Sequence, residues 1–576
     1  TMAESIVDAL LKQLKQNVND ALIHLNIGNE RKIKLLKKTR DLKFGDITIP
    51  EGCLKLDESQ KTELQRHLEE RCSAQQNFIK KVTRDKCSLL TFHLDRAQFC
   101  KAVFKTIQEN GQRYGHSKEK MSGPVFINSV NTNDLNNQLS LTDLRLAVLT
   151  CHIQKLLEAC GYSVISQVRD SRDLHKFINT TETVDTEQSC EQLILQQSKI
   201  EQHFIEKAKL FTSAACRCSS EQQHTMNKCD SNCEIVNPAG DYSSSLADSA
   251  NVALDLKKII QDKGLLTGTD GFDKNLHQTT VVADGKTTGV MQDAIRCAEF
   301  LQRKECCDCL HLVSYQQVYR QQKVQLILAA LSDQVAHQSL LVVGPVIGKQ
   351  GEATHSSNYQ TAAQVLYKSR YLQMKEASEM RHGNDAGEQI LDRQIQLLTS
   401  ASIKLDFLGN TSHTSLHIDA TSEDRGAESR LGAFVLYNSA RLAKLMSHFA
   451  EGVQKRLYPP LPPVEDIDYS LLREEEDWEL VFLYLAVFPD VVRQSLEVVF
   501  PADGRNIAKI HTNKVTNFIV AFTKCLSAHY SRYHVLVPGE PHLLPLMYSR
   551  LHLLKSAHQV LINSLELLGV ETLSFL

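Results

Sequence analysis

The chain has 576 residues, with 65 Lys and Arg against 68 Asp and Glu and a formal net charge of −3. This balance excludes a globally basic nucleic-acid-binding protein, so any such site must rest on local patches. The length exceeds what one hydrophobic core supports and predicts three or four domains. There is no run of 18 or more apolar residues, so no membrane span or membrane partner is expected.

The first 25 residues and the cysteines indicate a cytoplasmic protein. Apolar residues recur there at helical spacing between charged ones, which predicts an amphipathic helix and not a secretory signal with its unbroken apolar stretch. Without such a signal, the 16 cysteines are expected to be reduced thiols.

The pattern of elements predicts an α/β plus all-α protein with three parts. Residues 1–120 alternate helical and strand-like stretches and form a small α+β domain. Residues 121–390 alternate strands and helices in the order typical of a parallel, Rossmann-like sheet, interrupted by a polar stretch at about 180–290 that is predicted to be a flexible insertion. Residues 391–576 are predicted to be helical, after the opening helix with helices over about 468–485, 506–533 and 547–570.

The cysteine spacings do not predict a metal site. Those within the polar stretch fit no common zinc module, which favours incidental thiols: Cys216, Cys218, Cys229 and Cys233. Cys306 and Cys309 form a lone C-x-x-C with no second pair, which again favours ordinary thiols.

The stretch 344–351, GPVIGKQG, resembles a phosphate-binding loop only superficially. Three residues, where four are needed, separate Gly344 from Gly348, and Gln350 stands where Ser or Thr would bind magnesium. We therefore expect neither a bound metal nor a cofactor.

The helix predicted over 428–456 carries two separate stripes at 3.6 residues per turn. An apolar stripe about 100° wide suits packing against a core and consists of Leu431, Val435, Leu442, Leu445, Met446, Phe449 and Val453. A second stripe, about 60° wide, combines cations with one aromatic ring: Arg430, Tyr437, Arg441, Lys444, His448 and Lys455. Such a face suits a phosphate backbone and an unstacked base; the alternative is an ordinary solvated charged face.

The later helices of the same region add cations and aromatic rings. Including these, the candidate RNA-binding residues are Arg430, Phe434, Tyr437, Arg441, Lys444, His448, Tyr530, Arg532, Tyr533, Arg550 and Lys555. Arg and Lys would position the RNA through phosphate contacts, and the rings would stack on bases. For Phe434 and Tyr533, packing in the core is the alternative.

The C-terminal phrases LGAFVLYNSARLAKL, FPDVVRQSLE and SRLHLLKSAHQVLINSLELLGV resemble the DALR anticodon-binding domain of arginyl-tRNA synthetases. Upstream, ENGQRYGHS followed by GPVFINSVN resembles the junction between the N-terminal and catalytic domains of that family. The resemblance implies an N-terminal domain that contacts the outer corner of tRNA, a class I synthetase-like Rossmann domain, and a helical domain that grips the anticodon loop.

The residues that would perform aminoacylation depart from this family's pattern. Ser140 and Asp143 stand where a HIGH-type motif has histidines, and Asp143 would repel the phosphates of ATP. Glu352 and His355 stand in the loop that should supply a lysine to pyrophosphate. The family's Asp-Trp-Gly-Thr-Gln stretch is replaced by Asp170, Ser171, Arg172, Asp173 and Leu174. We therefore predict a degenerate Rossmann domain with no catalytic residues.

A chain of this kind is similar to the DALR anticodon-binding-domain-containing proteins, non-catalytic relatives of arginyl-tRNA synthetase. That resemblance implies an adaptor that binds arginine tRNAs, not DNA, and presents them to a tRNA 3-methylcytidine (position 32) methyltransferase. The sequence has no Gly-rich S-adenosylmethionine loop after a strand, so the methyl transfer would belong to the partner. The alternatives are an arginyl-tRNA synthetase with an atypical active site and a helical scaffold that binds only proteins.

Overall fold

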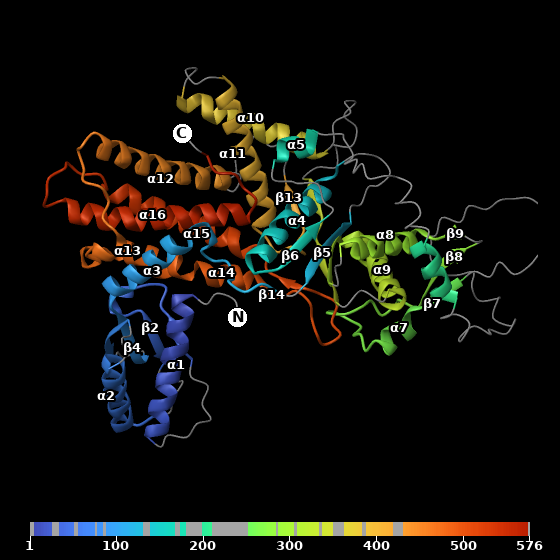
Figure 1. Cartoon of the computed structure of the whole chain (residues 1–576), viewed down its shortest axis with the longest axis horizontal. Helices are drawn as coiled ribbons and strands as arrows, with labels where there is room; N and C mark the ends of the chain where they lie inside the picture. Colours follow the sequence, from blue (N-terminus) through green and yellow to red (C-terminus); the bar gives the residue numbers. More distant parts are fainter. Residues whose placement is uncertain are drawn as a thin grey trace, which may run out of the picture.

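The computed structural model describes most of the chain. The described ranges are 5–25, 34–50, 56–74, 78–84, 88–121, 123–130, 139–166, 173–179, 199–209, 252–283, 286–304, 308–332, 337–348, 362–382, 388–418 and 430–573. In Figure 1 the N-terminal domain and the C-terminal helices lie side by side, and the parallel sheet separates them from the helices α8 and α9. No helix of these ranges is long and apolar enough to cross a membrane.

The N-terminal domain is an antiparallel sheet of order β1-β2-β4-β3 with helices against it. Its elements are α1 (Ile6–His24), β1 (Leu36–Lys37), a 3₁₀ helix (Leu42–Phe44), β2 (Ile47–Pro50), α2 (Glu58–Ala74), β3 (Ile79–Thr83), β4 (Ser88–Leu94), α3 (Arg96–Asn110) and a 3₁₀ turn (Gly111–Arg113). Helix α1 begins at Ser5, whose Oγ accepts a hydrogen bond from Asp8 N at 2.9 Å, as an N-cap requires. The predicted α+β character of this region is confirmed.

The middle of the chain forms a parallel sheet of order β11-β10-β5-β6. Its elements are β5 (Pro124–Val130), α4 (Leu141–Ala159), β6 (Ser163–Ser166), α5 (Leu174–Asn179), α8 (Gly289–Arg303), β10 (Asp308–Ser314), a 3₁₀ turn (Tyr315–Gln317), α9 (Val318–Leu331), β11 (His337–Val343) and β12 (Val346–Gly348). Alternate residues of a strand face opposite sides of a sheet. Val125 and Ile127 accordingly join one hydrophobic core, which contains α4, and Phe126 joins another under α8 and α9. The predicted Rossmann-like sheet is confirmed.

The prediction of a flexible insertion over about 180–290 is wrong for its later part. Residues 252–283 and 286–290 form an antiparallel sheet of order β7-β8-β9 and a helix, namely β7 (Val252–Asp255), α7 (Leu256–Asp262), β8 (Gln278–Ala283), β9 (Lys286–Thr287) and the start of α8. Residues 199–209 are helical. Leu254, Ile259 and Val281 anchor this unit in the core under α8 and α9. The cysteines predicted to be incidental, from Cys216 to Cys233, lie outside the described residues.

The rest of the chain is mainly helical. Its elements are α10 (Ala362–His382), α11 (Glu388–Leu408), β13 (Leu416–Ile418), α12 (Leu431–Gln454), 3₁₀ turns (Val464–Asp466, Tyr469–Leu471, Leu485–Val487), α13 (Glu475–Glu479), a π-helical turn (Leu480–Tyr484), α14 (Phe488–Ser495), β14 (Leu496–Val498), β15 (Lys509–Ile510), α15 (Lys514–Arg532) and α16 (Leu544–Leu567). The helix predicted over 468–485 is thus a series of short turns, and the one predicted from residue 506 begins at Lys514. Gly569, at φ 64°, ends the last helix as predicted.

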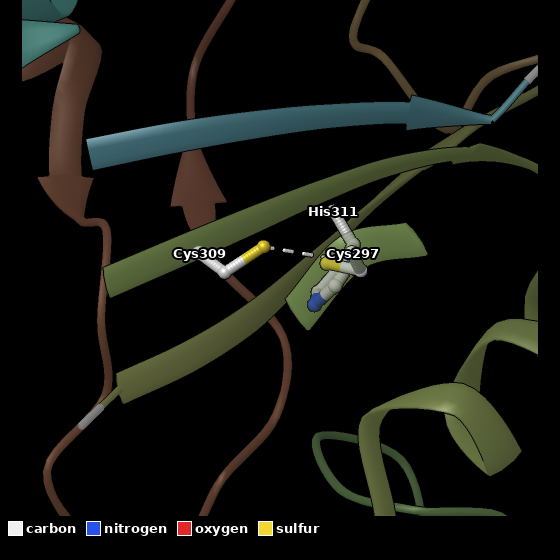
Figure 2. Close-up of side chains that lie close together, drawn as sticks. All are labelled: Cys297, Cys309 and His311. Carbon is white, nitrogen blue, oxygen red and sulfur yellow. Dashed lines mark hydrogen bonds between the residues drawn. The ribbon is translucent and has the colours of Figure 1, made fainter. Parts of the chain in front are cut away.

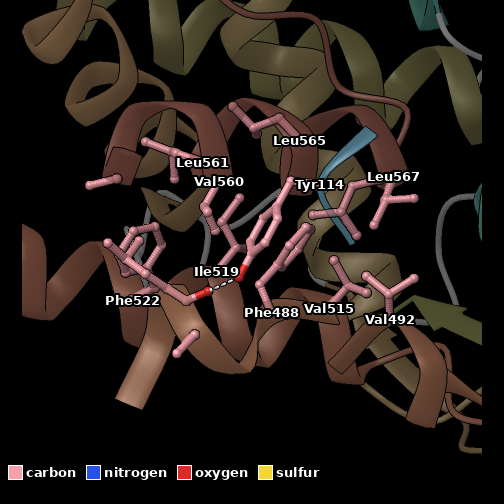
Figure 3. Close-up of a cluster of buried hydrophobic side chains, with 14 of the residues drawn as sticks. Tyr114, Phe488, Val492, Val515, Ile519, Phe522, Val560, Leu561, Leu565 and Leu567 are labelled. Carbon is pink, nitrogen blue, oxygen red and sulfur yellow. Dashed lines mark hydrogen bonds between the residues drawn. The ribbon is translucent and has the colours of Figure 1, made fainter. Parts of the chain in front are cut away.

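The segment 111–115 inserts the end of the N-terminal domain into the C-terminal helices. Figure 3 shows the Tyr114 ring among side chains of α14, α15 and α16, with its hydroxyl donating to Leu485 O at 2.8 Å. Asn563 Nδ2 donates to Gly111 O and Tyr114 O. Gly115 has φ +94°, and a Cβ there would lie 2.6 Å from the Phe488 ring, so only glycine fits. The motif ENGQRYG is therefore an interdomain joint.

A second joint lies at Trp478, the only tryptophan of the chain. Its Nε1 donates to Asp46 Oδ1 at 2.8 Å, and its ring stacks on Phe482 with centroids 5.2 Å apart. The Arg96 guanidinium lies 5.1 Å from the ring centroid. Trp478 therefore anchors the helical domain on the N-terminal sheet, and its fluorescence can report unfolding.

A third joint makes stability depend on pH. Asp490 of α14 accepts a hydrogen bond from Ser5 Oγ at 2.5 Å, and burial raises the pKa of its carboxyl to about 6. Between about pH 4 and 6 the folded chain holds a proton that the unfolded chain has released. The free energy of unfolding therefore falls through this window as pH rises, by roughly 1–2 kcal/mol.

The Asp490→Asn variant is expected to lack this pH-dependent contribution to the free energy of unfolding, because asparagine does not titrate. Urea unfolding followed by Trp478 fluorescence, at pH 4 to 7, should show the wild type losing stability relative to the variant as pH rises. Parallel pH curves for the two proteins would contradict the assignment.

Candidate nucleic-acid interface

Helix α12 places its two predicted stripes as the sequence indicated. Val435, Leu442, Leu445 and Phe449 are buried, and the other members of the apolar stripe pack against the same core. On the other stripe the cations are exposed: Arg430, Arg441, Lys444, His448 and Lys455. Phe434 and Tyr437 are half-buried, Phe434 between the two stripes and Tyr437 within the cationic stripe. The helix therefore presents a cationic face that includes two aromatic rings.

The orientation of this face is fixed by Gly432. A Cβ at that position would lie 2.5 Å from the backbone of Ala401 and Ser402 on α11, so α12 and α11 are in direct backbone contact there. Further along, the Tyr458 ring stacks on Phe449 with centroids 5.7 Å apart, which ties the proline-rich segment after α12 back onto the helix. The helix is held at both ends.

Arg441 and Tyr530 come together although they are 89 positions apart in the chain. The Arg441 guanidinium carbon lies 4.1 Å from the centroid of the Tyr530 ring, at the last turn of α15. At this distance a cation–π attraction orients both groups. The structure thus extends the face of α12 onto α15 through a planar, positively charged group.

The remaining candidates on α15 and α16 have acidic neighbours. Arg532 Nη1 donates to Glu476, and the Tyr533 hydroxyl donates to Glu476 Oε2 at 3.0 Å. Partial burial and these carboxylates raise the pKa of Tyr533 to about 12. The Arg550 guanidinium lies 4.8 Å from the Tyr533 ring centroid. Arg532 and Tyr533 therefore hold α15 on α13, which weakens the expectation that they are free to contact RNA.

Two further residues complete the description of this region. Lys555 of α16 is exposed and remains available for a phosphate contact. His529, which precedes Tyr530, is fully buried, and its Nε2 lies 2.7 Å from Asp477 Oδ1, so it belongs to the packing of α15 on α13.

The positions of the expected class I histidines form a helix cap. Ser140 is the N-cap of α4: its Oγ accepts from Asp143 N at 3.1 Å and donates to Asp143 Oδ2 at 2.6 Å. The Asp143 carboxylate also accepts from Ser140 N at 3.4 Å, which completes a capping box. The first turn of α4 is thus closed by its own side chains, where an ATP-binding helix would offer free N–H groups.

Arg145, two residues after the capping box, was not among the residues predicted from the sequence. Its side chain is fully buried, and its guanidinium donates to three backbone carbonyls, of Gly344, Thr411 and Thr414. Burial lowers the pKa of Arg145 to about 10. An arginine inside a helix rarely signals such a role in sequence, because most arginines are exposed. It joins α4 to the loops before β12 and β13.

Other parts of the predicted degenerate site are only partly visible. Glu352, His355 and residues 170–172 lie outside the described residues. Asp173 is described, and its Oδ2 accepts from Arg393 Nη1 of α11 at 3.0 Å. This residue therefore links the sheet domain to α11.

Comparisons with known proteins agree with this arrangement. Residues 435–576 match the DALR anticodon binding domain family. The chain is 32% identical over 323 residues to the zebrafish (Danio rerio) DALR anticodon-binding domain-containing protein 3, covering 56% of this chain and 55% of the relative. It is 28% identical over 450 residues to the mouse (Mus musculus) protein of that name, covering 76% and 75%. The match thus spans about half of the zebrafish relative's length.

Solved structures share the fold of the whole chain. Arginyl-tRNA synthetase from Thermus thermophilus superposes with a TM-score of 0.54 at 14% identity, covering 98% of this chain and all of the other. The enzyme from Plasmodium falciparum gives a TM-score of 0.54 at 14% identity, covering 98% and 99%. The chain therefore has the arginyl-tRNA synthetase fold with a DALR anticodon-binding domain at residues 435–576. Within that class its listed relatives, from zebrafish and mouse, are DALR anticodon-binding domain-containing protein 3.

The capping box of Ser140 and Asp143 is expected to contribute to the stability of the fold. Replacing Ser140 by alanine removes the cap of α4 and should lower the free energy of unfolding by about 1 kcal/mol. The same change at Ser447, exposed within α12, should not lower it, because alanine has the higher helix propensity. Urea unfolding measures both. Equal effects of the two substitutions would show that the box contributes nothing.

Proposed function

We propose that the chain is a non-catalytic adaptor that binds arginine tRNAs through the anticodon loop and presents them to a tRNA 3-methylcytidine methyltransferase. The main support is the juxtaposition, within a DALR anticodon-binding domain, of the exposed cations of α12 with the Arg441–Tyr530 pair. The arginyl-tRNA synthetase fold and the family relatives favour arginine tRNAs as the ligand.

The geometry suits a single-stranded loop. Arg430, Lys444 and His448 lie on one exposed face, so they can contact phosphates along one strand. The planar Arg441 guanidinium, already oriented on Tyr530, can stack on a splayed base, and such stacking contributes about 1–3 kcal/mol per base. Phosphate contacts would set the register of the loop, and base edges would select among tRNAs.

The absence of adenylate chemistry is part of the proposal. A class I active site needs groups at the N-terminus of the helix after the first strand to hold ATP phosphates. Here that position carries Ser140 and Asp143, whose side chains satisfy the helix end and add a negative charge. Methyl transfer would come from the partner, because the sequence has no Gly-rich S-adenosylmethionine loop after a strand.

A matched pair of charge reversals tests the interface. Lys444 on α12 and Lys257 on α7 are both exposed, and α7 lies at the opposite end of the molecule from the tip of α12 in Figure 1. Lys444→Glu should weaken binding of an arginine tRNA roughly tenfold in gel shifts, and Lys257→Glu should leave it unchanged. Arg441→Glu should weaken binding in the same way.

The salt dependence of the wild type provides the second readout of this test. Its affinity should fall as salt rises, and Lys444→Glu should show a shallower dependence because one phosphate contact is lost. Equal affinities for the Lys444 and Lys257 variants would place the RNA elsewhere on the molecule.

Selectivity and delivery need a separate experiment. RNA that co-purifies with the chain from cells should be enriched in arginine tRNAs, and 3-methylcytidine at position 32 of those tRNAs should fall when the chain is removed. Restoring the Lys444→Glu variant should recover the modification less well than restoring Lys257→Glu. Unchanged 3-methylcytidine after removal of the chain would contradict the delivery step.

Two alternatives remain as outcomes of simple assays. ATP–pyrophosphate exchange with arginine and tRNA would indicate an arginyl-tRNA synthetase with an atypical active site. A chain that binds no tRNA at any salt concentration, but co-purifies with proteins, would be a helical scaffold.

A further inference from the structure

Three soft or borderline ligand groups meet under helix α8, away from the cationic face of α12. They are Cys297 of α8 and Cys309 and His311 of β10, and all three are buried. One ligand atom from each lies within 4.8 Å of the others. Cys309 and His311 are two positions apart on a strand, so both point to the side that α8 covers. Figure 2 shows the three side chains converging between the strand and the helix.

The surroundings of His311 prepare one ring nitrogen to bind a cation. Gln338 Oε1, which can only accept, lies 3.1 Å from Nε2, so Nε2 carries the proton. Nδ1 therefore carries the lone pair, and Cys309 Sγ lies 3.8 Å from this atom.

Gln338 acts as the partner that orients a metal-binding imidazole. Its Nε2 donates to Gln325 O at 3.1 Å, and Gln325 and Asn506 exchange two hydrogen bonds of 2.9 Å. Such outer contacts fix the tautomer and the ring plane of a ligating histidine. The chain of amides reaches from β10 to Asn506 in the C-terminal region.

The distances fit a tetrahedral ion. With Zn–S bonds of about 2.3 Å and Zn–N bonds of about 2.0 Å, ligand atoms lie roughly 3.5–3.8 Å apart. The 3.8 Å between Cys309 Sγ and His311 Nδ1 already has this value. All three ligand atoms lie within 4.8 Å of one another, so a small rotation of a thiol would bring its sulfur to the separation that a tetrahedral ion requires.

A neighbouring carboxamide could supply the fourth ligand. Asn128 Nδ2 and Gln321 Nε2 lie 3.0 and 2.8 Å from His311 Nδ1. Rotating either carboxamide by half a turn would place its oxygen where its nitrogen now lies. The oxygen has lone pairs that can bind a metal ion, whereas the NH₂ group can only donate hydrogen bonds. In the orientation that the structure has, both amide nitrogens lie against this lone pair.

We propose that Cys297, Cys309 and His311 bind one Zn²⁺ ion, with a carboxamide oxygen or water in the fourth position. Thiolate and imidazole ligands favour Zn²⁺ over Mg²⁺ and Ca²⁺. Binding releases the two thiol protons, and the two thiolates neutralise the ion, so the buried site carries no net charge. The ion would hold α8 on the centre of the parallel sheet. This site is independent of the proposed RNA interface.

Metal analysis of the purified full-length chain tests the site. Mass spectrometry should find roughly one zinc per chain in the wild type, and clearly less in Cys297→Ser and Cys309→Ser. Cys160→Ser is the matched control, because Cys160 is also buried but lies at the end of α4, outside the cluster. Zinc content in that variant should equal that of the wild type.

Cobalt substitution keeps the test decisive if a variant fails to fold. Wild-type chain freed of metal and titrated with Co²⁺ should develop a thiolate-to-cobalt charge-transfer band and the visible bands of a tetrahedral site, and one equivalent of Zn²⁺ should remove them. A chain that contains no zinc and shows no such bands would overturn the proposal. Zinc retained in full by both cysteine variants would overturn it as well.

Discussion

The buried hydrogen bond between Trp478 Nε1 and Asp46 Oδ1 is the contact on which the placement of the domains depends. Burial raises the pKa of Asp46, while Leu94 N, Trp478 and Arg96 favour its charged form. Removing the indole would leave this carboxylate without one of its donors inside the protein, and an unpaired buried charge is costly. Since Tyr114 and Asp490 join the same two domains, the N-terminal sheet and the helical bundle form one continuous core.

Periodicity in the sequence predicted the elements whose patterns are local. The two stripes of α12 and the helix α16 belong to this group. The folded segment 252–283 was missed because its short strands are polar on alternate positions and its core contacts come from α8 and α9. The break of the helix predicted over 468–485 reflects tertiary packing around Trp478, which sequence periodicity does not record.

The candidate site, like the fold, was predictable from the sequence only where it depends on local patterns. The exposed cations of α12 follow from one helix, whereas the neutralisation of Arg532 depends on Glu476, 56 positions away. The thiol of Cys297 lies near His311 only because α8 crosses β10, so the cysteine spacing, from which Cys306 and Cys309 were predicted to be ordinary thiols, gave no sign of this cluster. Residues that act through partners distant in the chain become visible only once the fold is known.

The contact at Gly432 determines which groups would change conformation in the proposed RNA complex. Because α12 lies backbone against backbone on α11 there, the helix cannot roll about its axis without a clash. Its arginines and lysines thus project from a fixed helix, and in the proposed complex the conformational entropy lost on association would come from the side-chain tips and the bound nucleotides. A larger residue at this single position would tilt the helix and misdirect every charge on it together.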